Sequence, residues 1–531
     1  MHSGWRAGRR RATGRVLAGC PLILALVSIL LGQSCLWAAD SPSAQVPSSG
    51  QAAVGSRLAG IEEPPGNTGG IGYSAYRSAH PERLGTDGYW LTYQGKPFYL
   101  IGNGMESIYT NPPVFTTAES IERWMNYLDM LAGYKVNLIR FYAWAFVWYD
   151  KKIWQGSGPW PYTNLDQLGY DLDSSSDPYW DTVTAIAEAA AERGSIFQYV
   201  LFEGWMNKQL WDKNPWNLQR GGPLSDWVSF YDLVNVRNRY LQEKYVQQAL
   251  DKLGHLPNVI FEIANELAPN PYSQAWAAHW VSYAKERIPD LPLTISEPSW
   301  HFGPDMATER YWEWPGIDIV SPHETDGERA LYGGYVAGRF GEYWQRDLKK
   351  PLIVGEWCGP GDSLDYADER KLFWTAFASG GHGARSCWPL FHESPSLPWL
   401  RNMSDFLDGT TLGKPVGFSE MRPSPWVARL SGTPDGYQAL ALANAGKEYV
   451  IYIRAPKGYR EMVEGGQLEV NLPPGEYEAL WYDPKSGTVQ ATETLRSSGG
   501  RVSSPVFQHS EDVVLYLVVD SSPLPHQGAP W

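Results

Sequence analysis

The sequence contains little cysteine and fewer positive than negative charges. Four cysteines occur in 531 residues, and 44 Lys and Arg stand against 58 Asp and Glu, a formal net charge of −14. This acidic balance argues against nucleic acid or an anionic membrane surface as a partner. No nucleotide-binding glycine motif follows any predicted strand, and neither H-E-x-x-H nor a paired-cysteine motif occurs. We therefore expect no cofactor and no catalytic metal.

The only long uncharged stretch lies near the N-terminus. Arginines crowd residues 1–15, no charged residue occurs over 16–39, and LILALVSILL fills 22–31. The small residues Ala38 and Ala39 end the stretch, which is the order of a secretory signal peptide over 1–39. We expect a secreted, periplasmic or cell-surface protein, and the stretch is also long enough for an uncleaved anchor. Residues 40–75 are rich in Ser, Pro and Gly and predict a flexible segment.

Cleavage of that signal leaves two cysteines, Cys358 and Cys387. Both fall at the ends of strands predicted to be neighbours. In an exported protein they are candidates for a disulfide, and two buried thiols are the alternative, since sequence does not give their separation.

Two apolar runs end in a glutamate and organise the middle of the chain. NVIFEIANEL at 258–267 ends in Asn265 and Glu266, and PLIVGEW at 351–357 carries Glu356. Such runs are typical of parallel strands buried on both faces. A (β/α)₈ barrel collects the carboxyl ends of its strands at one rim, where active sites lie.

The β/α alternation predicts the TIM barrel over 76–414. A turn at Gln94-Gly95 between two β-like runs predicts a β-hairpin, and this hairpin leads into the first barrel strand. The other predicted strands and helices alternate as a barrel requires, and the competing layout is a doubly wound open sheet. The predicted strands are 97–102, 135–144, 195–202, 258–267, 291–296, 317–323, 351–357 and 384–391; the predicted helices are 117–131, 178–193, 228–253, 273–287, 332–348 and 368–379.

Beyond the barrel the pattern changes to short alternating runs separated by Gly and Pro. We expect a small antiparallel β-sandwich over 415–522, packed on the barrel, and a tail over 523–531. The runs are 439–443, 448–454, 467–471, 477–482 and 512–519.

A pair of carboxyl groups suits glycosidic bond cleavage. One donates a proton to the leaving oxygen, and the other attacks the anomeric carbon when the two lie about 5–5.5 Å apart. Glu266 and Glu356 are the candidates. Aromatic residues make up 14% of the chain, with 26 Trp and 31 Tyr. This excess suits both barrel packing and a groove whose rings stack on sugars.

FEIANEL and LIVGEW resemble the strand-four and strand-seven signatures of clan A glycoside hydrolases, especially family-five cellulases and mannanases. The resemblance implies that Glu266 is the acid/base and Glu356 the nucleophile of a retaining enzyme. It also implies substrate-site roles for a further set of residues: Arg140 in NLIRFYAW, which would keep the nucleophile ionised, Asn265, which would bind the 2-hydroxyl, His323 in IVSPHE, and Trp388 in SCWPLF, which would floor the −1 subsite.

The sequence departs from this family at two places. Strand three ends in FEGW, so that Glu203 and Trp205 stand where many relatives have a His, and the usual Tyr after the strand-six His is missing. Tyr332 or Tyr335 is a candidate replacement. At the other end, LPPGEYEALWYDPKSG resembles the β-domain labelled collagen-binding that follows apiosidase-like barrel hydrolases. GKPFYLIG, near the barrel entrance, resembles those hydrolases themselves. The sandwich either supports the barrel or binds glycan through exposed aromatics such as Trp481 and Tyr482.

The favoured function is therefore hydrolysis of a β-linked polysaccharide or oligosaccharide. Two alternatives remain open: a non-catalytic carbohydrate- or matrix-binding protein that kept the barrel, and a transglycosylase that uses the same residues.

Overall fold

The computed structural model describes most of the chain beyond residue 81. The described residues are 82–107, 118–143, 148–149, 152–153, 161–164, 169–209, 211–267, 269–296, 311–324, 331–332, 334–357, 366–386, 394–462 and 466–519. All of them belong to one compact unit. Within these ranges, no helix combines the length and the apolar character needed to cross a bilayer. The predicted signal peptide, flexible segment and tail lie outside the described residues.

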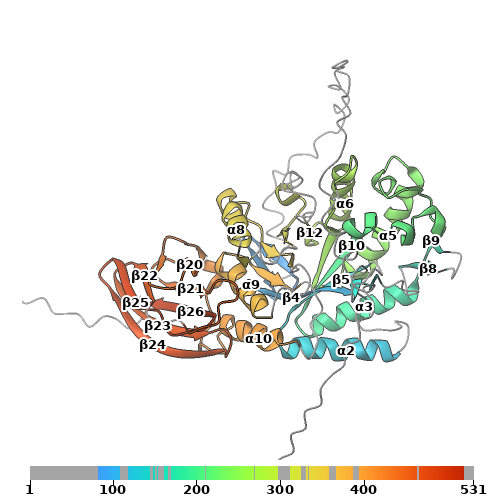
Figure 1. The fold of residues 1–531 in the computed structure, drawn as a ribbon. Helices are drawn as coiled ribbons and strands as arrows, with labels where there is room; N and C mark the ends of the chain where they lie inside the picture. The colour runs from blue at the N-terminus through green and yellow to red at the C-terminus, as the bar shows by residue number, and fades with distance from the viewer. Residues whose placement is uncertain are drawn as a thin grey trace, which may run out of the picture. The chain divides into compact units, whose positions relative to one another are not determined.

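An eight-stranded parallel sheet forms the barrel (Figure 1). The sheet closes through the bridge of Val320 to Leu352 and through the parallel pair β14 (His323–Glu324) and β16 (Glu356–Trp357). The predicted barrel is confirmed. In sheet order, its strands are β13 (Ile319–Ser321), β12 (Leu293–Ser296), β11 (Val259–Asn265), β10 (Ile196–Glu203), β5 (Leu138–Tyr142), β4 (Leu100–Ser107), β17 (Gly383–Arg385) and β15 (Ile353–Val354).

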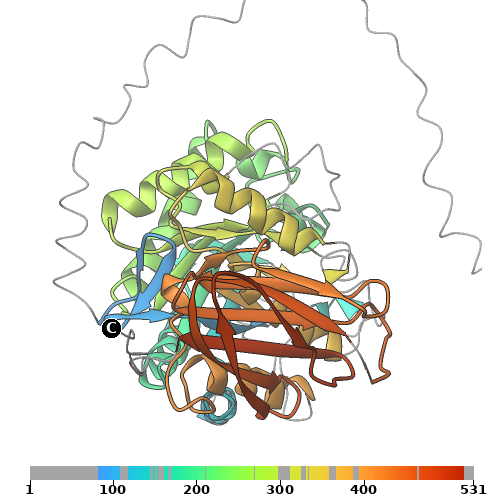
Figure 2. The same ribbon diagram turned by 90° about the vertical axis from the view of Figure 1, so that its left-hand side faces the viewer.

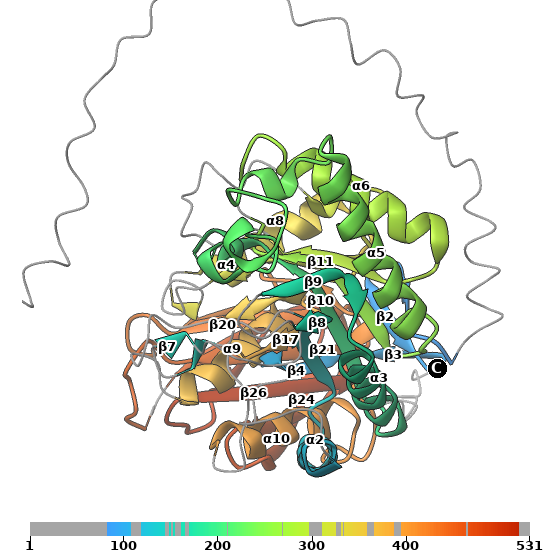
Figure 3. The ribbon, with the colours of Figure 1, turned by 90° about the vertical axis from the view of Figure 1, so that its right-hand side faces the viewer.

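Helices surround these strands, as Figure 3 shows for β10 and β11. They bury one face each: α3 covers the sheet with Trp180, Val183 and Ile186. The helices are α2 (Ala118–Gly133), α3 (Asp177–Glu192), α4 (Gly204–Gln209), α5 (Val236–Leu253), α6 (Ser273–Arg287), α8 (Tyr335–Arg346), α9 (Tyr366–Ala378) and α10 (Ser396–Leu407).

The helix predicted over 228–253 begins later than expected. Residues Ser229–Tyr231 form a 3₁₀ turn, and α5 starts only after Asn235. The side chain of Asn235 accepts a hydrogen bond from the Asn238 backbone N–H at 3.1 Å, which caps the helix. The short polar side chains of this stretch bind the backbone and favour turns over helix.

A three-stranded antiparallel sheet covers the amino-terminal end of the barrel. It consists of β1 (Gly85–Asp87), β2 (Trp90–Tyr93) and β3 (Lys96–Phe98). The predicted turn is present, because Gln94 and Gly95 both have positive φ, as a two-residue hairpin turn requires. The first barrel strand was predicted over 97–102, but β3 ends at Phe98 and β4 begins at Leu100, so the hairpin takes part of that run.

Two antiparallel sheets make up the C-terminal region. The predicted alternating runs all form strands. The strands β18 (Arg422–Pro423), β19 (Ala428–Ser431), β24 (Thr488–Ser497) and β25 (Gly500–Pro505) were not predicted, because each has at most one buried residue and few apolar ones. In sheet order, one sheet is β18 (Arg422–Pro423), β20 (Gln438–Asn444), β21 (Glu448–Arg454), β26 (Asp512–Val519), β23 (Gly475–Asp483) and β24 (Thr488–Ser497); the other is β19 (Ala428–Ser431), β22 (Gln467–Leu472) and β25 (Gly500–Pro505).

The central strands of the larger sheet are buried on both faces. Along β21, Tyr449 and Ile451 enter the core between the two sheets, whereas Val450 and Tyr452 join the core of the barrel. Tyr452 stacks on Trp374 of α9 with ring centroids 5.9 Å apart. Figures 1 and 2 show this sheet beside the barrel helices. The expectation that the sandwich packs on the barrel is confirmed.

Candidate active site

The carboxyl ends of neighbouring strands bring the predicted residues to one rim. In β10 and β11, Glu203 lies beside Asn265 in the parallel register. In β14 and β16, His323 lies beside Glu356. The His323 ring reaches across the barrel mouth, where its Nδ1 lies 3.4 Å from Oε1 of Glu266. The backbone of Glu356 is thus next to a residue that touches Glu266, although the Glu356 side chain lies outside the described part.

An apolar layer fills the barrel below this rim. Leu100, Leu138, Ile196, Ile260 and Ile353 come from five strands and form one cluster. The covering sheet adds apolar side chains to the same cluster, which seals the amino-terminal end. A barrel closed in this way is accessible for chemistry only from its carboxyl end.

A polar layer follows two residues further along the strands. Arg140 donates to Glu262 through Nε at 2.7 Å and through Nη2, which makes a two-point ion pair. Gln198 donates to the same carboxylate at 2.7 Å, and the Ser296 hydroxyl also donates to it. Burial alone would raise the pKa of Glu262, but the charge and hydrogen bonds of Arg140 outweigh it and the pKa is lowered. Glu262 is therefore a buried carboxylate.

The amide of Asn265 is held from both sides. Arg140 Nη2 donates to its Oδ1 at 2.6 Å. Its Nδ2 donates to both oxygens of Glu203, at 2.9 Å and 3.0 Å. A guanidinium only donates, and an ionised carboxylate only accepts, so these contacts fix which amide atom faces which neighbour. Glu203 serves here as the partner of Asn265.

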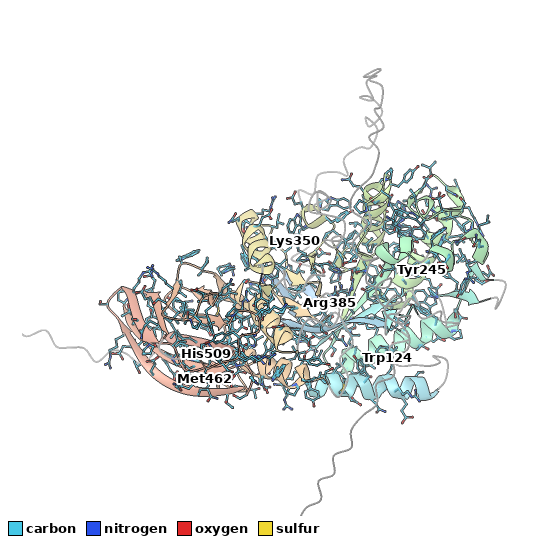
Figure 4. The ribbon with its side chains drawn as sticks, in the orientation of Figure 1. Trp124, Tyr245, Lys350, Arg385, Met462 and His509 are labelled. Carbon is cyan, nitrogen blue, oxygen red and sulfur yellow. The ribbon has the colours of Figure 1, made fainter. Side chains whose placement is uncertain are left out.

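His323 is a buried neutral imidazole. Burial, followed by the positive charges of Arg140 and Arg385, lowers its pKa well below the usual value. Arg385 Nη2 lies 3.3 Å from His323 Nε2. Because a guanidinium has no acceptor, Nε2 must accept and the ring proton must sit on Nδ1. The contact with Glu266 is accordingly a hydrogen bond from a neutral ring. Figure 4 shows Arg385 within the barrel.

Close packing constrains the backbone conformation at Glu266 and at the residue before Glu356. Glu266 has a φ of 42°, a left-handed conformation that is costly for a residue with a side chain. A Cβ on Gly204 would lie 2.6 Å from the carbonyl oxygens of Asn265 and Glu266. A Cβ on Gly355, the residue before Glu356, would lie 2.0 Å from the Ser321 hydroxyl oxygen. Both positions therefore require glycine.

Several predicted residues lie where their side chains are not described. Trp205 belongs to α4, but its side chain, like that of Glu356, is outside the described part. Trp388, Cys358 and Cys387 are likewise outside it. Their roles, including the possible disulfide, stay predictions.

Two sets of aromatic residues differ from the expectation or remain open: Trp481 and Tyr482, expected to be exposed, and Tyr332 or Tyr335, the candidates for the missing site tyrosine. Trp481 and Tyr482 are 3% and 0% exposed, so they are not surface aromatics. Both faces of β23 are covered, one by the sandwich core and one by the barrel. Tyr332 donates to Asp368 of α9 at the barrel–sandwich contact. The side chain of Tyr335 lies outside the described part.

Sequence reasoning did not identify Arg385 as a member of the site. Its signal was present: a single Arg in the small-residue run GARS of the last predicted strand. A fully buried Arg in a barrel strand requires acceptors nearby, and those acceptors mark the site. Among the described side chains, no group of three or more His, Cys, Asp or Glu is placed to hold a metal ion.

Comparisons with known proteins give a distant match in sequence and clear matches in fold. No family model matches the sequence. Endoglucanase A of Evansella cellulosilytica is 26% identical over 185 residues, which cover 33% of this chain and 36% of that protein. The chain thus matches about a third of its relative's length.

Two solved structures share the architecture. A glycoside hydrolase superposes with a TM-score of 0.57 and 14% identity, covering 83% of this chain and 98% of the other. A glycoside hydrolase family 5 structure from Bacteroides vulgatus gives a TM-score of 0.54 at 14% identity, covering 82% and 93%. The chain therefore has the fold of these glycoside hydrolases, and the coverage extends beyond the barrel.

Proposed function

We propose that this protein is a retaining glycoside hydrolase that cleaves a β-linked glycan, as cellulases and mannanases do. The observation that carries the proposal is the link between the two glutamates. His323 pairs with Glu356 along the strands and contacts Glu266 through its ring. Two carboxyl groups at one barrel mouth are the machinery that double displacement needs. The fold of the solved glycoside hydrolases supports the same assignment.

In the first step Glu266 gives its proton to the glycosidic oxygen, and the bond from that oxygen to the anomeric carbon breaks. The Glu356 carboxylate attacks the anomeric carbon and forms a glycosyl ester. In the second step Glu266 takes a proton from water, whose oxygen attacks the same carbon and releases Glu356. Two inversions leave the configuration retained.

The polar layer supports this chemistry through Arg140. Its described contacts hold Glu262 and Asn265 at once, so the guanidinium is fixed directly below the rim. We propose that this fixed positive charge also favours the ionised form of Glu356. Asn265, oriented by Arg140 and Glu203, would present its amide to the sugar 2-hydroxyl. Trp388 and Trp205 would contribute aromatic surface to the subsites.

Kinetics on a glycan panel test the proposal. Wild type should release reducing ends from at least one β-glucan or β-mannan, and Glu356→Ala should abolish that release. Azide should restore turnover of an activated aryl glycoside by Glu266→Ala, because azide attacks the glycosyl ester without a general base. Glu122→Ala, which removes an exposed glutamate of α2, is the matched control and should be fully active.

Two outcomes would favour the alternatives. If wild type and Glu356→Ala bound glycan equally and neither hydrolysed it, the protein would be a carbohydrate-binding protein. If transfer to an added sugar acceptor exceeded hydrolysis, it would be a transglycosylase.

We also propose that the protein is exported and that residues 1–39 are removed. Sequencing the N-terminus of the mature protein tests this, and the expected first residue is Asp40. A mature chain that retains residues 16–39 would instead support a membrane anchor.

A further inference from the structure

The turns at one end of the sandwich surround a hollow of about 310 Å³. It lies among the turn before β19, the β20–β21 turn, the β22–β23 turn and the start of β25. Trp426, Tyr449, Asn471 and Pro473 are among the lining residues. Its size is at the lower end for ligand sites, which fits a short stretch of a chain molecule.

Trp426 makes this hollow unusual. Trp426 is 69% exposed, and every other tryptophan that the structure describes is buried or half-buried. An indole left in water costs free energy, because it holds a large apolar surface that packing would otherwise remove from solvent. The exposed ring is therefore available to a ligand.

Backbone hydrogen bonds on both sides of Trp426 fix the turn that carries it. Ser424 donates its backbone N–H to Ala441 at 2.7 Å, and Val427 accepts from the backbone N–H of Asn471 at 2.8 Å. Opposite, the Tyr449 hydroxyl accepts from the backbone N–H of Gly446 at 2.6 Å and holds the β20–β21 turn. A preformed site loses little conformational entropy when a ligand binds.

The lining chemistry indicates the class of ligand. All eight lining residues are uncharged. Asn471 is exposed, and its side-chain amide makes no hydrogen bond to another described residue, so one donor and one acceptor group face the hollow's rim. A flat apolar ring beside a free amide matches a sugar, which has an apolar C–H face and hydroxyl groups at its edge. An anionic ligand would find no counter-charge there.

We infer that this hollow, which we call the Trp426 site, is a second glycan-binding site, separate from the barrel mouth. A pyranose ring of a neutral polysaccharide stacks on Trp426, and Asn471 hydrogen-bonds its hydroxyl groups. The inference rests on the proposed function only for the choice of a neutral glycan as ligand. Binding at the Trp426 site would keep the barrel close to an insoluble substrate and raise the effective concentration of cleavable bonds.

Depletion assays with the full chain test the inference. Wild type, Trp426→Ala and Asn471→Ala are mixed at 4 °C with insoluble cellulose and with insoluble mannan, and the free protein is measured. Trp426→Ala should bind at least about tenfold more weakly to the polysaccharide that wild type retains, since most of the stacking area is lost. Asn471→Ala should show a smaller loss. Tyr240→Ala, which removes an exposed aromatic of α5, should bind as wild type does.

A second readout separates this site from the barrel. All variants should hydrolyse a short soluble aryl glycoside at the wild-type rate. Cellohexaose or mannohexaose should protect the 444–447 and 471–473 backbone from hydrogen exchange in wild type and Tyr240→Ala but not in Trp426→Ala. Equal retention of wild type and Trp426→Ala would overturn the inference, whatever the catalytic result. So would a shift from dimer to monomer in Trp426→Ala, because the hollow would then be a contact between copies of the chain.

Discussion

At the scale of single residues, the orientation of one amide organises the barrel mouth. Arg140 and Glu203 bind opposite ends of the Asn265 side chain. Removing either partner leaves a buried polar group without its hydrogen bond, which costs about 1–3 kcal/mol.

Glu203→Ala should therefore lower kcat/KM on the preferred glycan by about 10- to 100-fold, because the Asn265 amide loses the acceptor that orients it. Glu203→Gln keeps an acceptor of the same shape and should lose less than Glu203→Ala. Steady-state kinetics of both variants measures the difference. Equal activity of Glu203→Ala and wild type would show that Asn265 needs no such partner.

A second residue, His382, governs a pH effect on stability. Its Nδ1 accepts from the backbone N–H of Leu352 at 2.8 Å, and burial followed by the charge of Arg422 lowers its pKa to about 3. The unfolded chain takes up this proton near pH 6.5, whereas the folded chain does not until about pH 3. The free energy of unfolding should thus be fully retained above pH 6.5 and fall below it, by up to about 1.4 kcal/mol per pH unit.

His382→Asn keeps an acceptor for the Leu352 N–H and removes the titration. Urea unfolding at pH 7 and pH 5 should show the variant's stability deficit shrinking by about 2 kcal/mol at the lower pH. His255→Asn, at an exposed position, is the control and should show no such change. A deficit that stays constant with pH would contradict a neutral buried His382.

At the scale of elements, close contact between a helix start and a strand end positions Glu266. Gly204→Ala should lower kcat more than about tenfold, because its Cβ would press on the β11 backbone and displace the carboxyl group. Gly338→Ala, at the fourth residue of α8, is the matched control: a Cβ there meets nothing within 4 Å. That variant should keep full activity and gain about 0.5–1 kcal/mol of stability. Equal losses in both variants would point to a general effect of alanine.

The elements also show what the sequence could and could not predict. Buried parallel strands appear as continuous apolar runs, so the run at 258–267 located β11 and the glutamate at its end. The burial of Trp481 and Tyr482 was missed because alternation marks two faces without saying that both are covered. The layer of Arg140, Glu262 and Arg385 depends on side chains from distant strands meeting inside the barrel, which spacing along the chain does not reveal.

Trp426 was overlooked for a related reason. It stands in a turn between short strands, where no periodicity draws attention to it. The residue stands out because its side chain is exposed, and the exposed fraction of a side chain depends on how the rest of the molecule folds around it.

At the scale of the whole molecule, a buried ion cluster joins the barrel to the sandwich. Arg370 of α9 donates to Asp512 at 2.6 Å and to Glu511 at 2.8 Å, and the side chains are at most 4% exposed. Tyr452 adds a hydrogen bond to Asp512 at 3.0 Å. The two parts are therefore expected to unfold together.

Arg370→Ala should cost about 3–5 kcal/mol, because Asp512 would remain buried without its cation, whereas Glu511 keeps Arg460 and Lys485 within 4 Å. Scanning calorimetry should show a lower melting temperature and a transition that separates into two. Arg496→Ala removes an exposed partner of Glu476 and should cost less than about 1 kcal/mol. A single unchanged transition in Arg370→Ala would show that the apolar contact alone couples the two parts.

The central claim is that Glu356 and Glu266 act together on one sugar at one barrel mouth. Mass spectrometry after incubation with 2,4-dinitrophenyl 2-deoxy-2-fluoro glycosides of cellobiose and mannobiose tests it most directly, because such sugars form the glycosyl ester and release it slowly. We predict one added sugar on the peptide that contains Glu356, and none in Glu356→Ala. An adduct on another residue, or a product of inverted configuration from an unlabelled enzyme, would contradict the account.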